Sequence, residues 1–410
     1  MKRLSAYNLL DPAVVENPFE FHRALREQAP VYEVPGIGLF LISTYAGVLE
    51  VLADPGRFSS KSGPAVGGMA PPPEVMEAMS AGYPTVDTLL TNDPPDHIRY
   101  RSLVSRAFSA RRVAGLEDYI RGVAETLMKN FLHEGTVDLL PRYAVPLPLS
   151  VIADQLGVPR SDMALFKRWS DDAVAPLGGM ISLERSVECA HSIVEFQHYM
   201  AKKIEERRAA PQDDILSDLI GARLDGADAL NVAEMVSILQ QFMVAGNETT
   251  TNLIASATML LGQNPEQLAL VRKDPTLIPN MAEEALRLES PVQSLFRLAT
   301  EDTQVLGTAI PKGGRVVVMY ASANRDAAVF PDPDRFDVQR ENARAHLAFG
   351  KGEHFCIGAA LARKEAAIAF ETLLGRTRDL RLAPGKNDFA HVPSFILRGL
   401  KQLWVEVSPA

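Results

Sequence analysis

Cysteine is scarce in this chain of 410 residues, which contains only Cys189 and Cys356. Two cysteines cannot form the framework of a disulfide-rich domain, and we expect no disulfide. Long apolar runs are also missing, so no segment can span a bilayer as a helix. Residues 1–28 lack the apolar centre of a signal peptide. The sequence therefore predicts a cytoplasmic protein that is not inserted in a membrane.

Basic residues are outnumbered by acidic ones, 42 to 51, which gives a formal net charge of −9. This balance argues against nucleic acid as a partner. The chain has no internal repeat and no low-complexity linker, which excludes a repeat architecture. Apolar residues make up 47% of the chain, enough to bury a large core. The composition is that of a soluble enzyme.

Strand patterns are few and short. Residues 31–34 and 39–42 predict a β-hairpin. Residues 315–320 and the tail, residues 403–407, are expected to join or flank the same small sheet. Helical patterns dominate from about residue 93 to about residue 290.

One cysteine, Cys356, lies in the segment 349–358, Phe-Gly-Lys-Gly-Glu-His-Phe-Cys-Ile-Gly. The three glycines of this segment permit positive φ and let the backbone pass close to a flat ligand. Residues 359–366 favour a helix, so the sulfur is expected at a helix N-terminus, where its pKa falls and a thiolate forms. The alternative is a structural cysteine beside a glycine-rich turn. The complete segment favours a thiolate that binds haem iron.

This segment resembles the haem-binding signature of the cytochrome P450 family, F-G-x-G-x-H-x-C-x-G, at every fixed position. Three further motifs in the family's order extend the resemblance over essentially the whole chain. The resemblance implies a mainly α fold with a small β-rich lobe, in which haem b lies between a long central helix and the loop and helix that carry Cys356. It also implies one catalytic domain, residues 1–410. Its β-rich lobe comes from about residues 28–60, 300–325 and 385–408, and the helical lobe is the remainder.

The first motif is Glu284-Ala285-Leu286-Arg287, which matches the family pattern E-x-x-R. On a helix these two charged side chains share one face, a common arrangement on helix surfaces. The resemblance implies that Arg335, in the loop 330–336, completes a buried cluster with Glu284 and Arg287. Such a cluster would hold the loop that carries Cys356.

The second motif lies in a long helix that the capping pattern of Asn231 and Glu234 begins and Asn264-Pro265 ends. The polar residues 247–250 near its centre are costly to bury without a purpose. One explanation is a helix crossing, with a threonine bonded to the carbonyl four residues earlier.

The family resemblance gives the same residues a role in oxygen chemistry. It implies that Thr249 hydrogen-bonds dioxygen and that Glu248 relays protons. Many relatives have aspartate at the position of Glu248. Gly246 is expected to loosen the helix over the iron, and Ala245 to contact the haem.

The third motif is the segment 93–101, in which Pro94-Pro95 predicts a helix start. His97 and Arg101 then lie on one helix face, able to bind one anionic group, and a solvated helix face is the alternative. The resemblance implies a haem propionate as that group. The further haem contacts that the resemblance implies are Arg297, His354, Phe349, Gly350 and Gly358.

The substrate pocket is implied only by the resemblance. Its expected residues are Gln240, Gln241, Val244, Val292, Leu295, Phe395 and Ile396. Most are apolar, and a glutamine is expected to orient a carbonyl or carboxylate of the substrate. Residues 60–90 and 175–182 are rich in glycine and proline and are expected to form lids over the pocket.

The resemblance implies a haem-thiolate monooxygenase that inserts one atom of O₂ into a small hydrophobic substrate of terpenoid, steroid, fatty-acid or aromatic type. The chain has no room for a flavin or iron–sulfur domain, so a ferredoxin and a ferredoxin reductase are expected to bring electrons from NAD(P)H. Lys351, Arg363 and Lys364 form a basic patch on which an acidic ferredoxin is expected to dock, with ordinary solvated side chains as the alternative. We expect a monomer.

Three other functions stay open at this point. A peroxide-driven relative would normally lack the acid–alcohol pair, so Glu248 and Thr249 argue against it. A haem-binding sensor would need no oxygen-activating groove. A thiol hydrolase without haem would need a basic partner for Cys356.

Overall fold

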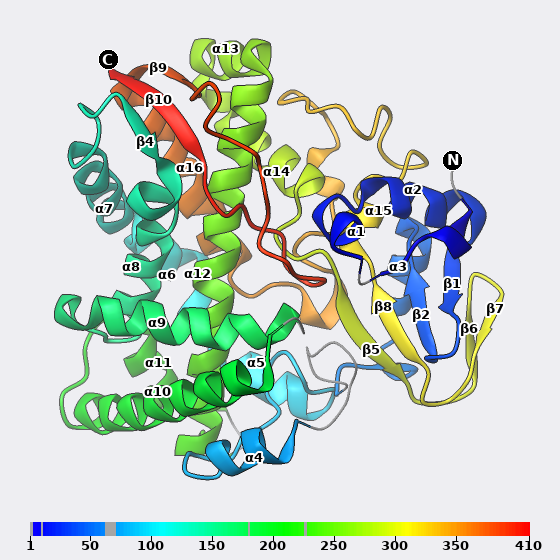
Figure 1. The fold of residues 1–410 in the computed structure, drawn as a ribbon. Helices are drawn as coiled ribbons and strands as arrows, with labels where there is room; N and C mark the ends of the chain where they lie inside the picture. The colour runs from blue at the N-terminus through cyan, green and yellow to red at the C-terminus, as the bar shows by residue number, and fades with distance from the viewer. Residues whose placement is uncertain (1–2, 10, 62–70, 179–180, 225–227) are drawn as a thin grey trace.

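The computed structural model describes residues 3–9, 11–61, 71–178, 181–224 and 228–410. Helices form most of this described chain, and the larger sheet lies at one side together with the N-terminal helices (Figure 1). This arrangement confirms the predicted mainly α fold with a small β-rich lobe.

The helical part surrounds the long central helix α12 (Figure 1). Its helices are α4 (Pro73–Met79), α5 (Asp96–Ser105), α6 (Ala110–Gly115), α7 (Glu117–Lys129), α8 (Pro146–Gln155), α9 (Met163–Val174), α10 (Leu183–Ala209), α11 (Ile215–Gly221), α12 (Val232–Gln263), α13 (Pro265–Lys273), α14 (Ile278–Leu288) and α16 (Ala359–Arg376).

The β-rich lobe contains a five-stranded sheet in the order β1-β2-β8-β5-β3. Its strands are β1 (Val31–Val34), β2 (Leu39–Ile42), β3 (Phe58–Ser59), β5 (Leu295–Ala299) and β8 (Arg315–Val318). The predicted hairpin is confirmed, because β1 and β2 pair antiparallel with Val31 opposite Ile42. The lobe also holds α1 (Pro12–Glu16), α2 (Phe19–Gln28), α3 (Tyr45–Leu52), α15 (Tyr320–Ala323) and the two-stranded ribbon of β6 (Thr303–Val305) and β7 (Thr308–Ile310).

The C-terminal strand does not join this sheet, so that prediction was wrong. Strand β10 (Trp404–Pro409) lies between β4 (Thr136–Asp138) and β9 (Thr377–Leu382) in a separate three-stranded sheet. The reason is that β9 follows directly from the end of α16, within the helical part. Its antiparallel partner β10 therefore lies there as well.

Helix α12 begins at the capping box that the sequence predicts. The Asn231 side chain accepts a hydrogen bond from the Glu234 N–H at 3.0 Å, and the Glu234 carboxylate accepts one from the Asn231 N–H at 2.8 Å. The helix ends at Asn264, also as predicted. Its 32 residues make a rod of about 48 Å that crosses the molecule.

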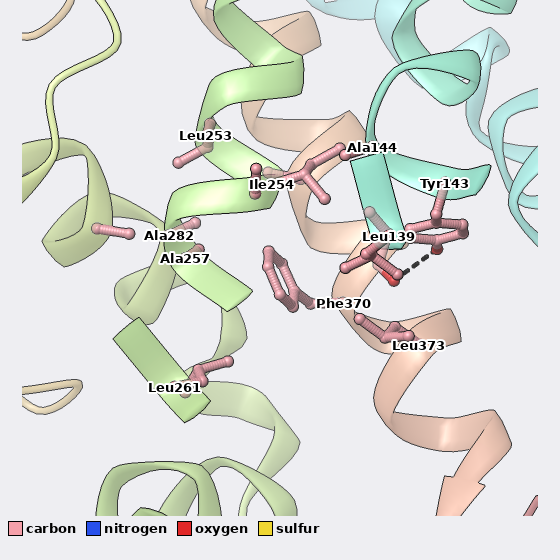
Figure 2. Packing of buried hydrophobic residues seen from close by; sticks show 14 of the residues in the cluster. Leu139, Tyr143, Ala144, Leu253, Ile254, Ala257, Leu261, Ala282, Phe370 and Leu373 are labelled. Atoms are coloured by element: carbon pink, nitrogen blue, oxygen red, sulfur yellow. Dashed lines mark hydrogen bonds between the residues drawn. The ribbon is translucent and has the colours of Figure 1, made fainter. Parts of the chain in front are cut away.

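A buried apolar cluster fixes α12 against α16 and α14 (Figure 2). Its members around this contact are Leu253, Ile254, Ala257 and Leu261 of α12, Phe370 and Leu373 of α16, Ala282 of α14, and Leu139, Tyr143 and Ala144 of the segment before α8. The Tyr143 hydroxyl donates a hydrogen bond to the Ala369 carbonyl at 2.8 Å. Because the interior is close-packed, the start of α16 has a fixed place relative to the centre of α12.

A buried ion cluster holds the segment that leads to Cys356. Glu284 and Arg287 are fully buried and pair at 2.7 Å. The third member is Arg340, whose Nε lies 2.9 Å from Glu284 Oε1, and not Arg335 as the sequence suggested. The side chain of Arg335 is 63% exposed, while its carbonyl accepts hydrogen bonds from Arg287 and Arg340. The chain turns between Asp337 and Arg340, which brings the later arginine back to Glu284.

A second carboxyl group ties α16 to α12 without an ion pair. Glu365 of α16 is 2% exposed and shares a hydrogen bond with Thr250 of α12. Burial raises the pKa of Glu365 well above its ordinary value. The folded protein therefore keeps a proton on this group at pH values where an unfolded chain loses it.

We predict that Arg340→Leu destabilises the fold strongly, by roughly 3–5 kcal/mol, because it leaves the buried Glu284 short of a partner. Arg335→Leu is the matched control and should change the free energy of unfolding by about 0.5 kcal/mol or less, since the side chain is exposed. Urea unfolding curves of both variants test this. Equal midpoints for the two variants would contradict the assignment of Arg340.

We also predict that Glu365 makes the protein less stable as pH rises. Above the unfolded-state pKa near 4.5, the unfolded chain releases this proton and the folded chain retains it, so the free energy of unfolding falls up to the raised folded pKa. Glu365→Gln should be more stable at neutral pH and show a shallower fall, measured by urea unfolding from pH 5 to 8. Glu371→Gln, on an exposed position of the same helix, should keep the parent's slope. The prediction is refuted if the free energy of unfolding of Glu365→Gln falls with pH as steeply as that of the parent.

Candidate active site

The loop before Cys356 has the backbone that its glycines suggest, with one exception. Gly350 and Gly352 have φ of 67° and 71°, a region that side chains rarely adopt. Gly358 has φ of −83°, so it does not use the positive φ that glycine permits. A Cβ on Gly352 would lie 2.8 Å from the Leu52 carbonyl oxygen, which shows that this glycine permits close packing on α3.

The sulfur of Cys356 lies at the N-terminus of α16, as the sequence predicts. The Cys356 N–H donates to the Phe349 carbonyl at 2.9 Å, which closes the loop, and α16 begins at Ala359. Burial raises the pKa of the Cys356 thiol, although the N–H groups of Gly358 and Ala359 and the charges of Arg101 and Arg363 act to lower it. The expected low pKa is therefore not a property of the protein alone. A metal ion would remove the proton outright.

A cluster of nitrogen-bearing side chains, some of them buried, lies in and beside this loop. The rings of His97 and His354 are 4.2 Å apart between centroids. His97 is 2% exposed, and both its ring nitrogens lack a partner among the residues that the structure describes. Burial and the charges of Arg101 and Arg297 lower the pKa of His97, and burial, Arg297 and His97 lower that of His354 to about 3.

This donor cluster fits an anionic group. Asp93 lies nearby, but its carboxylate is taken by the Ser60 N–H at 2.7 Å and by the Ser59 hydroxyl. Within the described chain, Arg101 and Arg297 form no ion pair with a carboxylate. The carboxylates of a haem would satisfy the orphaned nitrogens of His97 and the two arginines together.

The centre of α12 carries the polar residues and is also the place where this helix crosses α8. A Cβ on Gly246 would lie 3.2 Å from Ile152 of α8, so Gly246 lets the two helices approach. The helix is continuous through this position, and the predicted loosening is not observed. The Thr249 hydroxyl donates to the Ala245 carbonyl at 2.7 Å, the backbone bond considered as an alternative. Its oxygen keeps lone pairs for a second partner.

Glu248 and its neighbours face α9. Burial raises the pKa of Glu248, with Asp171 adding to the effect and Lys167 opposing it. The Glu248 carboxyl accepts a hydrogen bond from the Asn252 amide at 3.3 Å. Lys167 pairs with Asp171 on the exposed face of α9. Glu248 therefore lies between the interior of α12 and a charged pair at the surface.

The predicted pocket residues divide into three groups. Gln241 is already bonded to the loop before α5, with its amide donating to Thr88 at 2.8 Å and accepting from the Leu90 N–H at 3.2 Å. It fastens that loop to α12, so its amide has a structural role in addition to the role expected toward a substrate. Ile396 is 2% exposed and packs in the apolar core against α2 and the sheet.

The other predicted pocket residues are partly buried: Gln240, Val244, Val292, Leu295 and Phe395. Val292 and Leu295 lie between the two apolar clusters of the β-rich lobe. Ser237 and Gln241 both hold the loop of residues 81–92, a contact that no sequence pattern indicated. Parts of the two expected lids, residues 62–70 and 179–180, lie outside the described residues.

Two members of the predicted basic patch are ion-paired. Arg363 binds the buried carboxylate of Glu283 at 2.7 Å, and Lys364 binds Glu117 at 2.9 Å. Lys351 is exposed. The patch is therefore less positive than the sequence alone suggested.

Comparison with known proteins places this geometry in a family. The family model for "Cytochrome P450" matches residues 180–385. The chain is 38% identical over 401 residues to "Cytochrome P450 107B1" of Saccharopolyspora erythraea, covering 96% of each chain. It is 35% identical over 415 residues to "Vitamin D(3) 25-hydroxylase" of Pseudonocardia autotrophica, covering 98% of this chain and 97% of that one.

A solved structure agrees with these sequence matches. The structure of cytochrome P450 CYP109Q5 from Chondromyces apiculatus has a TM-score of 0.87 and 38% identity, covering 98% of each chain. None of the helices in the described ranges is both long and apolar enough to cross a membrane. The chain therefore belongs to the cytochrome P450 family of haem-thiolate monooxygenases.

Proposed function

We propose that this cytochrome P450 holds haem b through the Cys356 thiolate and oxidises a hydrophobic substrate of steroid or terpenoid size. The proposal is carried by one observation, which is that two features of the site lie close together. A half-buried sulfur lies at the N-terminus of α16, and a partly buried donor cluster without a carboxylate partner lies close to it. One haem satisfies both, because its iron binds the sulfur and its carboxylates bind the donors.

Several residues would hold the haem. Cys356 would bind the iron, with the N–H groups of Gly358 and Ala359 stabilising the negative sulfur. His97, Arg101 and Arg297 would bind the carboxylates, and His354 would join them in place of its hydrogen bond with the Ser60 hydroxyl at 3.0 Å. Gly350 and Phe349 belong to the loop that presents the sulfur.

The chain's own residues would manage protons near the bound oxygen. Haem, when bound, supplies the iron at which dioxygen is reduced and one oxygen atom passes to the substrate. The Thr249 hydroxyl already donates its hydrogen bond to the Ala245 carbonyl. Its oxygen would therefore act as an acceptor, for a hydrogen bond from a protonated group in the site. This bond would keep that group in place.

Glu248 would carry protons toward Thr249. Its raised pKa means that it retains a proton at higher pH than an exposed glutamate does. It lies between Asn252 and the charged pair Lys167–Asp171 at the surface. A rotation of this side chain would connect the surface with the interior of α12.

The apolar residues expected in the pocket favour a hydrophobic substrate. Val244, Val292 and Leu295 are partly buried and offer apolar contact. Burial of about 300 Å² of substrate at ~25 cal/mol/Å² would supply roughly 7 kcal/mol before the costs of association. The relative named a vitamin D(3) 25-hydroxylase supports a substrate of this kind over a small aromatic acid.

We further propose that an acidic ferredoxin, reduced by a ferredoxin reductase, delivers the electrons. The support for this proposal is the exposed Lys351, which lies in the loop that carries Cys356. Arg363 and Lys364 are ion-paired, so we expect them to contribute less to docking than Lys351.

The iron ligand can be tested by substitution. We predict that Cys356→His abolishes the red-shifted Soret band of the reduced carbon-monoxide complex, because a histidine cannot replace the thiolate. Cys189→Ala is the matched control, since Cys189 is buried in α10, and it should retain the band. A thiolate band in Cys356→His would overturn the assignment.

The role of Thr249 can be tested by coupling. We predict that Thr249→Ala binds haem and substrate normally but forms about tenfold less oxidised product per NADH consumed, with the remaining electrons reducing dioxygen to hydrogen peroxide. The reason is that a hydrogen bond to a charged group is worth about 1.5–3 kcal/mol, and 1.4 kcal/mol changes partitioning tenfold. Product, NADH and peroxide are measured together.

The controls separate the hydroxyl from the relay acid. Thr249→Ser keeps the hydroxyl and should stay close to the parent in coupling. Glu248→Gln should instead slow turnover as a whole, because it removes the acid and leaves the Thr249 hydroxyl in place. If Thr249→Ala is as tightly coupled as Thr249→Ser, the hydroxyl has no part in oxygen chemistry.

A further inference from the structure

A second buried glutamate, Glu283, lies next to Glu284 on α14 but binds a different part of the chain. Its side chain is 2% exposed. Successive residues of a helix point about 100° apart, so the two carboxylates face different neighbours. Glu284 binds Arg287 and Arg340, whereas Glu283 binds His346 and Arg363.

Glu283 and Arg363 form a bidentate pair, in which one carboxylate accepts two hydrogen bonds from one guanidinium group. Arg363 Nε lies 2.7 Å from Oε1, and Arg363 Nη2 lies 3.1 Å from Oε2 of the same carboxylate. Two parallel bonds fix both the place and the plane of the guanidinium group. Arg363 is on α16, seven residues after Cys356, so this pair anchors the start of that helix to α14.

His346 completes the site as a neutral donor. Its Nδ1 accepts a hydrogen bond from the Ala348 N–H at 3.1 Å, so the ring proton lies on Nε2. Nε2 lies 2.9 Å from Glu283 Oε2 and donates to it. Burial alone would raise the pKa of Glu283, but the bonds with His346 and Arg363 lower it to about 2. Glu283 is therefore a carboxylate whose charge opposes that of Arg363.

Arg363 connects this pair to the sulfur. Its guanidinium carbon lies 4.6 Å from the centre of the Phe349 ring. Phe349 begins the loop, and its carbonyl accepts the hydrogen bond of the Cys356 N–H at 2.9 Å. The positive charge of Arg363 also acts directly on the Cys356 sulfur.

We propose that Glu283 is a positioning residue that holds Arg363 against Phe349, offsets most of its positive charge, and so sets how much negative charge the Cys356 sulfur carries. The inference rests on the proposed ligand role of Cys356. Its consequence is a reduction potential lower than Arg363 alone would produce, because a less compensated sulfur favours the oxidised iron.

The test is the midpoint potential of the haem in three variants, measured by spectroscopic titration. Glu283→Gln keeps the shape and removes the negative charge, so the potential should rise. Arg363→Gln removes the positive charge, so the potential should fall. For a one-electron couple, a change on the order of tenfold in the reduction equilibrium corresponds to about 59 mV. The double variant Glu283→Gln with Arg363→Gln should return close to the parent.

Opposite signs distinguish this proposal from a structural role. If the pair only supports the loop, both single variants loosen it and move the potential in the same direction. Glu283→Asp, which keeps the charge, should recover most of the parent value. Glu117→Gln is the control, because Glu117 pairs with the neighbouring Lys364 at an exposed site, and it should leave the potential unchanged.

Each result supports or overturns the proposal. Equal potentials for the parent and Glu283→Gln, or shifts of the same sign in both single variants, overturn it. If Glu283→Gln does not retain haem, the comparison of Arg363→Gln with the double variant decides, and equal potentials for these two overturn the proposal. A parent protein without the thiolate-type carbon-monoxide band would overturn the ligand assignment and this proposal together. If the parent protein does show that band, the ligand assignment stands, and a negative result then counts only against the role of Glu283.

Discussion

Two neighbouring carboxylates on α14 hold both ends of the segment that carries Cys356. Glu284 binds Arg340, which precedes the loop, and Glu283 binds Arg363, which follows it. Buried ion pairs contribute little net stability, because removing two charges from water costs nearly as much as their attraction returns. They do specify geometry, since each guanidinium accepts only a narrow set of positions. The sulfur therefore has a defined place while the loop itself is rich in glycine.

Local patterns predicted the parts of this structure that depend on neighbouring residues. The capping box at Asn231, the hairpin at residues 31–42 and the glycines at 350 and 352 need only short-range information. The family signature added the place of Cys356 before a helix. In each case a few consecutive residues determine the backbone.

Long-range contacts were the ones that the sequence did not reveal. Arg335 and Arg340 are both plausible partners for Glu284, and only the path of the loop decides between them. The pairing of β10 with β4 joins segments far apart in the chain. Gln241 bonds to a loop about 150 residues earlier, which no pattern on its own helix signals. Residue type indicates which of these residues can form a polar contact, but it does not indicate which distant segment provides the partner.

The titrating groups show how cofactor binding and protonation are linked. In the protein alone, burial raises the pKa of the Cys356 thiol and lowers the pKa of His97 and His354, so all three are biased toward their neutral forms. An iron ion at the sulfur would release a proton, whereas a carboxylate beside the histidines would raise their pKa and favour proton uptake. The two effects would have opposite signs, so we expect haem affinity to depend less on pH than the affinity of a thiolate site alone. If the donor cluster holds the haem carboxylates as proposed, it would offset part of the proton release at the metal besides orienting the cofactor.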